Sequence, residues 1–200
     1  MRKVNIRDLV QTAILGAMAY VLMLWRFPLP FMPPFMDFDF AAIPELVGAY
    51  IMGPTAGITI IGIKLLLKLV TTGTGSAFTG EIQNFILSSA LILTSVLIYR
   101  RTRTRKAALL GMIAGTLISS IVAVFSNMYL IIPFFVKAYG LSMEIIINMA
   151  QAVNKYVDSE MKFILLGIIP FNLIKGSAST AVLYITYPAL MRIPGREGRS

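Results

Sequence analysis

The chain has 200 residues, of which 57% are hydrophobic, and its formal net charge is +9. Its mean hydropathy of +0.79 exceeds that of a soluble domain, in which charged residues cover the surface. The sequence contains no histidine and no cysteine, which excludes disulfides, imidazole or thiolate metal sites, and Cys or Ser–His nucleophiles. We therefore expect a single all-α integral membrane domain, residues 1–200, with neither a metal nor a cofactor.

Basic residues lie in three clusters beside apolar segments. The clusters are Arg2, Lys3 and Arg7; Arg100, Arg101, Arg103, Arg105 and Lys106; and Arg192, Arg196 and Arg199. This arrangement favours anionic lipid head groups and the cytoplasmic side of a membrane over nucleic acid, for which no binding module is visible. We expect all three clusters, and hence both termini, at the cytoplasmic face.

The first apolar segment, Leu9–Trp25, predicts a transmembrane helix. The preceding basic residues resemble the start of a signal peptide, and residues 17–19 loosely resemble a cleavage site, but the apolar run continues to Trp25. Ala13, Gly16 and Ala17 lie three and four residues apart, which permits close approach of another helix. The spacing alone leaves open whether that helix belongs to this chain or to a partner.

Residues 26–40, RFPLPFMPPFMDFDF, interrupt the helical pattern with several prolines. The segment is too apolar for an ordinary solvated loop, so we expect an outer loop that lies at the membrane surface and covers a site. The next segment, 41–70, is divided by Gly53-Pro54, which favours a turn. A hairpin of Ala41–Gly53 and Pro54–Val70 places every basic cluster on one side, although its first arm is short for a bilayer.

The remaining segments complete a six-helix prediction with both termini inside. They are an outer loop at 71–80, a helix at Glu81–Tyr99, a helix at Ala107–Ile132, an outer region at 133–160 with a short helix near Met143–Asn154, and a last helix at Lys162–Leu190.

Polar residues recur at one depth near the predicted outer side. They are Glu81 and Asn84 in the fourth helix, Asn127 in the fifth, and Asn172 and Lys175 in the sixth. A charge at the centre of a spanning helix costs roughly 2.5–3.5 kcal/mol on insertion scales, so such residues usually face a cavity or a partner. Asn172 and Lys175 are three residues apart and share a helix face. Amides and a lysine donor suit a flat heterocycle with carbonyl and ring-nitrogen acceptors.

Simpler interpretations of these residues stay open. Asn84 alone could form an interhelical hydrogen bond, and Lys175 could pair with Glu81. The chain has no G-x-x-x-x-G-K-[ST] phosphate-binding loop, so ATP-driven transport would need other subunits.

Several short segments occur in a distinctive order. They are A-I-L-G-A in the first helix, F-P-L-P-F-M-P-P-F in the outer loop, D-F-A-A-I-P-E-L at 39–46, G-P-T-A-G at 53–57, T-G-T-G at 72–75, G-E-I-Q-N-F at 80–85, S-N-M-Y at 126–129 and F-N-L-I-K at 171–175. In this combination, over nearly the whole chain, they resemble the substrate-binding S components of energy-coupling factor (ECF) vitamin transporters, specifically the riboflavin-binding members.

This resemblance implies a six-helix S-component bundle in a bacterial cell membrane that binds riboflavin and performs no chemistry. Its implied partners are a transmembrane coupling subunit and two cytoplasmic ATPase subunits, whose ATP hydrolysis tips the S component so that the site opens inward.

The resemblance also assigns roles to residues. Asn127, Asn172 and Lys175 would hydrogen-bond the isoalloxazine ring. The outer loop, with Phe31, Asp39 and Phe40, would cover the ligand. Glu81 and Asn84 match the family pattern, either as ligand contacts or as supports of the loop. Ala13 and Ala17, with Gly16 beside them, would face the coupling subunit.

Three alternatives remain from the sequence. The first is an S component for thiamine, pantothenate or a folate, and the second is a membrane assembly subunit without a ligand. The third, a membrane-embedded enzyme using Glu81 or Glu45 with Lys175, lacks a metal-type carboxylate cluster.

Overall fold

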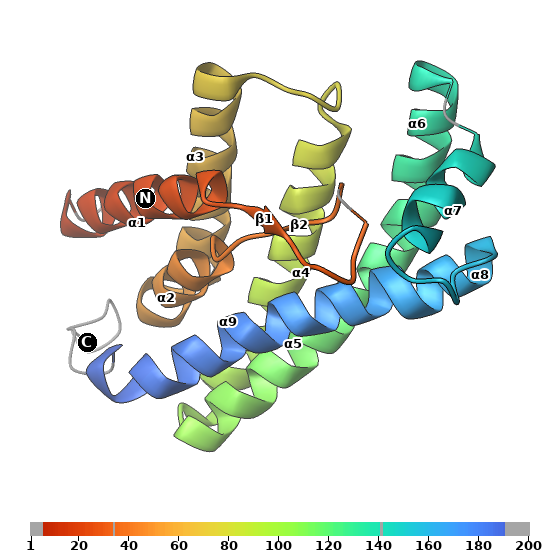
Figure 1. Ribbon diagram of the computed structural model, residues 1–200. Coiled ribbons are helices and arrows are strands. Elements are labelled where there is room, and N and C mark those ends of the chain that lie inside the picture. The colour runs from red at the N-terminus through yellow and green to blue at the C-terminus, as the bar shows by residue number, and fades with distance from the viewer. Residues whose placement is uncertain (1–5, 34, 141, 191–200) are drawn as a thin grey trace.

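The computed structural model describes residues 6–33, 35–140 and 142–190 (Figure 1). The elements in chain order are α1 (Ile6–Leu24), β1 (Phe27–Pro28), β2 (Asp37–Phe38), α2 (Ala42–Met52), α3 (Pro54–Thr72), α4 (Thr79–Thr102), α5 (Arg105–Ser126), the π-helical turn η1 (Asn127–Ile131), α6 (Ile132–Tyr139), α7 (Met143–Gln151), α8 (Glu160–Phe163), the π-helical turn η2 (Ile164–Ile168) and α9 (Ile169–Leu190).

Within these residues, five helical segments are long and apolar enough to cross a membrane. They are Ile6–Leu24, Pro54–Thr72, Thr79–Thr102, Arg105–Tyr139 and Glu160–Ala189. The sixth apolar helix, α2, has 11 residues and is therefore about 17 Å long, roughly half of the hydrocarbon thickness. The predicted hairpin is confirmed, because α2 and α3 are separate helices joined at Gly53, whose φ of 104° favours glycine.

The fifth helix was predicted to end at Ile132, and this boundary is wrong. The chain stays helical to Tyr139, because the Ile132 N–H donates to the carbonyl of Asn127, five residues earlier. This wider turn comes immediately before Pro133, which has no N–H to donate. The turn η2 likewise precedes Pro170. The predicted short helix near 143–154 is confirmed as α7.

Residues 26–40 contain a small antiparallel hairpin, a local exception to the all-helical prediction. Phe27 pairs with Phe38 and Pro28 pairs with Asp37. Met32 and Phe38 are buried together with Phe171 of α9. The hairpin therefore packs on α9, across the front of the bundle in Figure 1.

The bundle brings α9 against α5 and α5 against α4, and these pairs lie side by side in Figure 1. A Cβ atom at Gly176 of α9 would overlap the side chain of Thr116 of α5, so glycine is needed for this close approach. The main hydrophobic core fills the space between α2, α3, α4, α5 and α9 and includes Leu46, Ile61, Ile92, Met112 and Leu183.

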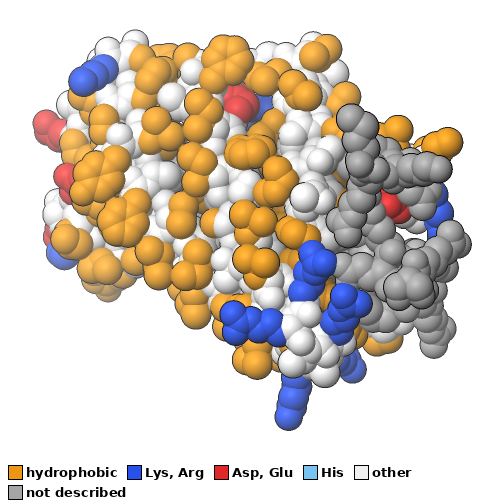
Figure 2. Space-filling model, turned by 180° about the vertical axis from the view of Figure 1, so that it is seen from behind, with side chains coloured by type: hydrophobic (Ala, Val, Ile, Leu, Met, Phe, Trp, Pro, Cys, Tyr) orange, Lys and Arg blue, Asp and Glu red, His pale blue; other side chains and the backbone are white. Residues whose placement is uncertain are grey.

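Basic side chains gather at one end of the molecule, and much of the face in Figure 2 is apolar. The central basic cluster lies at the turn between α4 and α5, and all of its residues are exposed: 100, 101, 103, 105 and 106. We call this end the basic end. The opposite end carries loops 26–40 and 73–78, and we call it the loop end. The terminal basic residues, apart from Arg7, lie outside the described residues, so the cytoplasmic orientation of the termini stays a prediction.

Candidate functional site

The loop and the last helix meet through an ion pair at the loop end. Asp39, which is buried, lies just before α2, and its Oδ2 atom is 2.7 Å from Nζ of Lys175 on α9. Its Oδ1 atom accepts a hydrogen bond of 2.9 Å from the N–H of Ala41. Burial by itself raises the pKa of the Asp39 carboxyl, but the Lys175 ammonium and the two hydrogen bonds outweigh it, so the pKa is below its ordinary value.

The two asparagines predicted to hold a ligand both turn their amides onto their own helices. Asn172 donates from Nδ2 to the carbonyl of Ile168 at 2.8 Å, and Asn127 donates from Nδ2 to the carbonyl of Ala123 at 2.7 Å. Ala123 and Ile168 belong to one buried cluster, which brings the two asparagine sites together. The amide orientation leaves each Oδ1 atom as the acceptor that can face a ligand.

These asparagines also adjoin the two π-helical turns. Asn127 is the first residue of η1, and the acceptor of Asn172 is the last residue of η2. Such turns are frequent at functional sites because they alter the direction of side chains along an otherwise regular helix.

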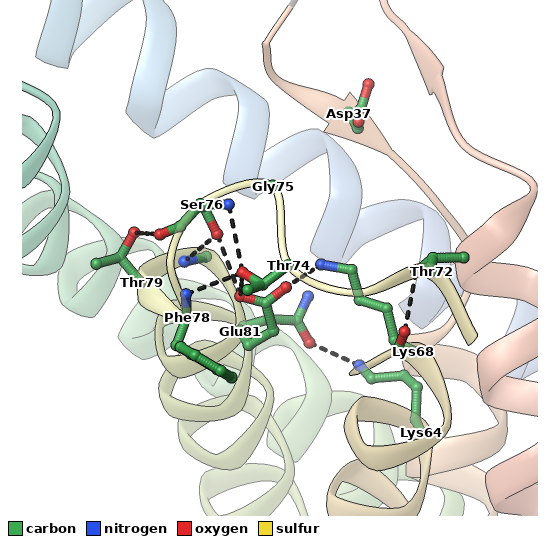
Figure 3. Close-up of polar contacts among 12 residues, drawn as sticks. Asp37, Lys64, Lys68, Thr72, Thr74, Gly75, Ser76, Phe78, Thr79 and Glu81 are labelled. Carbon is green, nitrogen blue, oxygen red and sulfur yellow. Dashed lines mark hydrogen bonds and ion pairs between the residues drawn. The ribbon is translucent and has the colours of Figure 1, made fainter. Parts of the chain in front are cut away.

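Glu81 supports a loop. It pairs with Lys68 of α3 and accepts hydrogen bonds of 3.1 Å from Thr74 Oγ1 and Ser76 Oγ (Figure 3). Its side chain is buried. The suggested pairing of Lys175 with Glu81 is therefore wrong: each has its own partner, because the loop places Asp39 beside Lys175.

A second buried ion pair was missed by sequence reasoning. Lys64 of α3 is 1% exposed and pairs with Glu45 of α2, which is 0% exposed. The same ammonium donates to Oδ1 of Asn84 on α4 at 2.6 Å. Removing one partner of such a pair costs about 3–5 kcal/mol. The available signal was Lys64 and Lys68, four residues apart on one face of an apolar segment.

The aromatic residues of the loop differ in position. Phe40 is partly buried and its ring lies 5.1 Å from that of Phe38, edge to face. Phe31 is 49% exposed, and its contact with a ligand stays a prediction. The inward position at the loop tip is taken instead by its neighbour Met32, which is 3% exposed.

The small residues of α1 face two directions. Ala13 and Ala17 are exposed, whereas Gly16 is buried. A Cβ at Gly16 would lie 2.6 Å from Cγ2 of Ile63 on α3. The prediction that Gly16 faces a partner is therefore wrong, because it makes room for α3 within the bundle. In the described part of the chain, no group of three carboxylates could hold a metal ion.

Comparison with known proteins identifies the family of this bundle. The family model for "ECF transporter, substrate-specific component" matches residues 7–187. The chain belongs to this family. It is therefore an S component, a multi-pass membrane subunit of a bacterial transporter and not an enzyme.

Individual relatives agree with this assignment. The S component is 34% identical to the riboflavin transporter RibU of Staphylococcus aureus (strain TCH60) over 94% of each chain. It is 29% identical to the riboflavin transporter FmnP of Bacillus subtilis (strain 168), over 92% of this chain and 91% of that one. A structure described as the S component of a bacterial ECF transporter is 29% identical and superposes with a TM-score of 0.72, over 93% of this chain and 96% of that one.

Proposed function

We propose that this S component binds riboflavin at the loop end of the bundle and delivers it for uptake by an ECF transporter. The observation that carries the proposal is the set of polar groups on α9 and η1. Lys175 supplies hydrogen-bond donors, and the amide orientations of Asn127 and Asn172 supply acceptors. An isoalloxazine ring matches this set, because its polar edge combines carbonyl and ring-nitrogen acceptors with one N–H donor.

The loop 26–40 would close over the bound ring. Its side chains Met32 and Phe38 already pack on Phe171, one residue before Asn172. Its Asp39 contacts Lys175 directly. Loop closure would thus cover the apolar part of the ring and order the lysine at the polar edge.

The energy for uptake would come from partner subunits. A transmembrane coupling subunit would contact the exposed Ala13/Ala17 face of α1, and two ATPase subunits would hydrolyse ATP. Several curated relatives carry the name riboflavin transporter, which supports riboflavin as the ligand.

The test is the visible absorption spectrum of the purified protein, followed by titration of riboflavin against its fluorescence. We expect a flavin spectrum or saturable quenching, and a loss of affinity of about tenfold or more for Lys175→Ala and Asn172→Ala. Lys155→Ala, an exposed lysine beside Tyr156, is the matched control. A colourless protein that binds thiamine, pantothenate or folate would replace riboflavin as the ligand. Unchanged riboflavin affinity in both Lys175→Ala and Asn172→Ala would show that the ligand binds at another site.

A further inference from the structure

Lys64 is the most deeply buried lysine among the described residues, and the proposed binding of riboflavin by Lys175 and the asparagines gives it no role. It lies in α3 and joins three helices through its ammonium group, which pairs with Glu45 of α2 and donates to Asn84 of α4. An ionised residue within a spanning helix is expensive, so its retention points to a function.

The contact with Lys64 fixes the direction of the Asn84 amide. An ammonium group can only donate hydrogen bonds, so the amide must turn its oxygen toward Lys64. The Nδ2 group, with its two N–H donors, is then directed away from Lys64. Asn84 thus differs from Asn127 and Asn172, whose Nδ2 groups donate to backbone carbonyls one turn earlier and whose oxygens remain as acceptors.

Lys64 also lies within electrostatic reach of the candidate site. Its charge contributes to lowering the pKa of Asp39, the partner of Lys175. Glu45, which holds Lys64, follows Asp39 by six residues and lies in the first turn of α2. The buried pair is therefore connected to the loop through the start of α2.

The neighbouring ion pair shows what distinguishes Lys64. Lys68 and Glu81 join α3 to α4 one turn nearer the loop end than Lys64 and Asn84 do. The remaining oxygen of Glu81 accepts hydrogen bonds from Thr74 and Ser76 (Figure 3). Lys64 instead holds a side chain that retains donors. The Lys68 contact secures a loop, whereas the Lys64 contact orients an amide.

We propose that Lys64, held by Glu45, is a positioning residue that presents the Nδ2 group of Asn84 to an acceptor atom of the ligand. This inference rests on the proposed function, with a flavin carbonyl or ring nitrogen as the acceptor. Asn84 supplies a donor on the α4 side of the ring, and Lys64 acts only through it.

The test is a mutant cycle read by riboflavin affinity and by the visible spectrum of the bound flavin. Glu45→Gln with Lys64→Met removes both charges while keeping similar volumes, so no unpaired charge is left buried. We expect this double variant and Asn84→Ala each to weaken binding about tenfold. Because both changes remove the same donor, the triple variant should also lose about tenfold.

Two results overturn the proposal. One is wild-type affinity in the double variant. The other is a loss of about a hundredfold in the triple variant, which means that Lys64 and Asn84 act independently and that Lys64 is a structural support. The spectrum of the bound flavin should shift in the same direction in the double variant and in Asn84→Ala, and Lys155→Ala should leave it unchanged.

A second variant covers failure of the double variant to fold. Asn84→Leu removes the amide donors at similar volume and leaves the Lys64–Glu45 pair intact, so it should fold and still lose about tenfold in affinity. Wild-type affinity in Asn84→Leu overturns the proposal. If the wild-type protein does not bind riboflavin, the proposed function is wrong, whatever the role of Lys64. The same mutant cycle, measured with the vitamin that does bind, then tests the role of Lys64.

Discussion

Asp39 and Lys175 are 136 residues apart in the chain, and their side chains meet at 2.7 Å. The contact joins the loop before α2 to the helix that carries the proposed ligand donors. Because the proposed function gives this ammonium group a second contact, with the ligand, we expect the closure of the loop and the retention of the ligand to be coupled.

Asp39→Asn should speed the release of riboflavin. The variant keeps the shape of the side chain but removes the charge that holds Lys175, and charge-assisted hydrogen bonds are roughly twice as strong as neutral ones. We expect the dissociation rate, measured by stopped-flow fluorescence, to rise about tenfold. Asp37→Asn is the matched control, because Asp37 lies on the same loop and pairs with Arg26 instead. Equal riboflavin dissociation rates in wild type and Asp39→Asn would show that the Asp39–Lys175 ion pair does not hold the loop closed.

Release should depend on pH only under acidic conditions. The pKa of Asp39 is lowered where the loop contacts α9, so the ion pair is fully present above the ordinary aspartate pKa of about 3.9 and is lost as pH falls through the lowered value. The dissociation rate should stay constant between about pH 7 and 5 and rise below about pH 4. Asp39→Asn should remove the acidic rise. An inflection near neutral pH in the wild type would assign the effect to another group.

The helical topology could be predicted from sequence because its signals are local. Gly53-Pro54 breaks a hydrophobic run where α2 ends and α3 begins, and the basic cluster at 100–106 lies at the turn between α4 and α5. The continuation of the fifth helix past Pro133 could not be predicted, because proline ordinarily ends a helix and the π-helical turn that accommodates it has no clear sequence signal.

The candidate site was only partly predictable. The shared face of Asn172 and Lys175 follows from their spacing. The choice of Asp39 as the partner of Lys175 depends on how the loop folds back, which no local pattern encodes. The partners of Lys64 could not be predicted, because two lysines four residues apart in an apolar helix give no hint of the glutamate and asparagine that face Lys64 from α2 and α4.

Gly176→Ala should destabilise the contact between α9 and α5. A Cβ at this position would overlap the side chain of Thr116, and overpacking typically costs about 1–3 kcal/mol. We expect a lower thermal unfolding temperature and weaker riboflavin binding. Thr116→Ser, which removes the obstructing methyl group, should partly restore both. Gly62→Ala is the control, because nothing lies within 4 Å of its added Cβ. Equal stability of the two alanine variants would contradict the close approach.

Glu81→Gln should loosen the loop between α3 and α4 more than it weakens binding. The variant loses the charge that holds Lys68 and one of the strong acceptors for Thr74 and Ser76. We expect faster amide hydrogen exchange at residues 73–78, with riboflavin affinity within about threefold of wild type. A large loss of affinity with unchanged exchange would show that Glu81 contacts the ligand.

Substitutions on α1 should separate binding from transport. Ala13 and Ala17 are exposed on one side of the helix, and leucine at both positions would keep a coupling helix at a distance. We expect Ala13→Leu with Ala17→Leu to abolish riboflavin uptake by the assembled transporter while leaving the affinity of the isolated subunit unchanged. Val21→Leu, at another exposed position of α1, is the control for added apolar volume. Gly16→Val should behave differently, because its side chain would meet Ile63 and so lower thermal stability in the isolated subunit. Uptake that survives the double leucine change would assign this face of α1 to lipid.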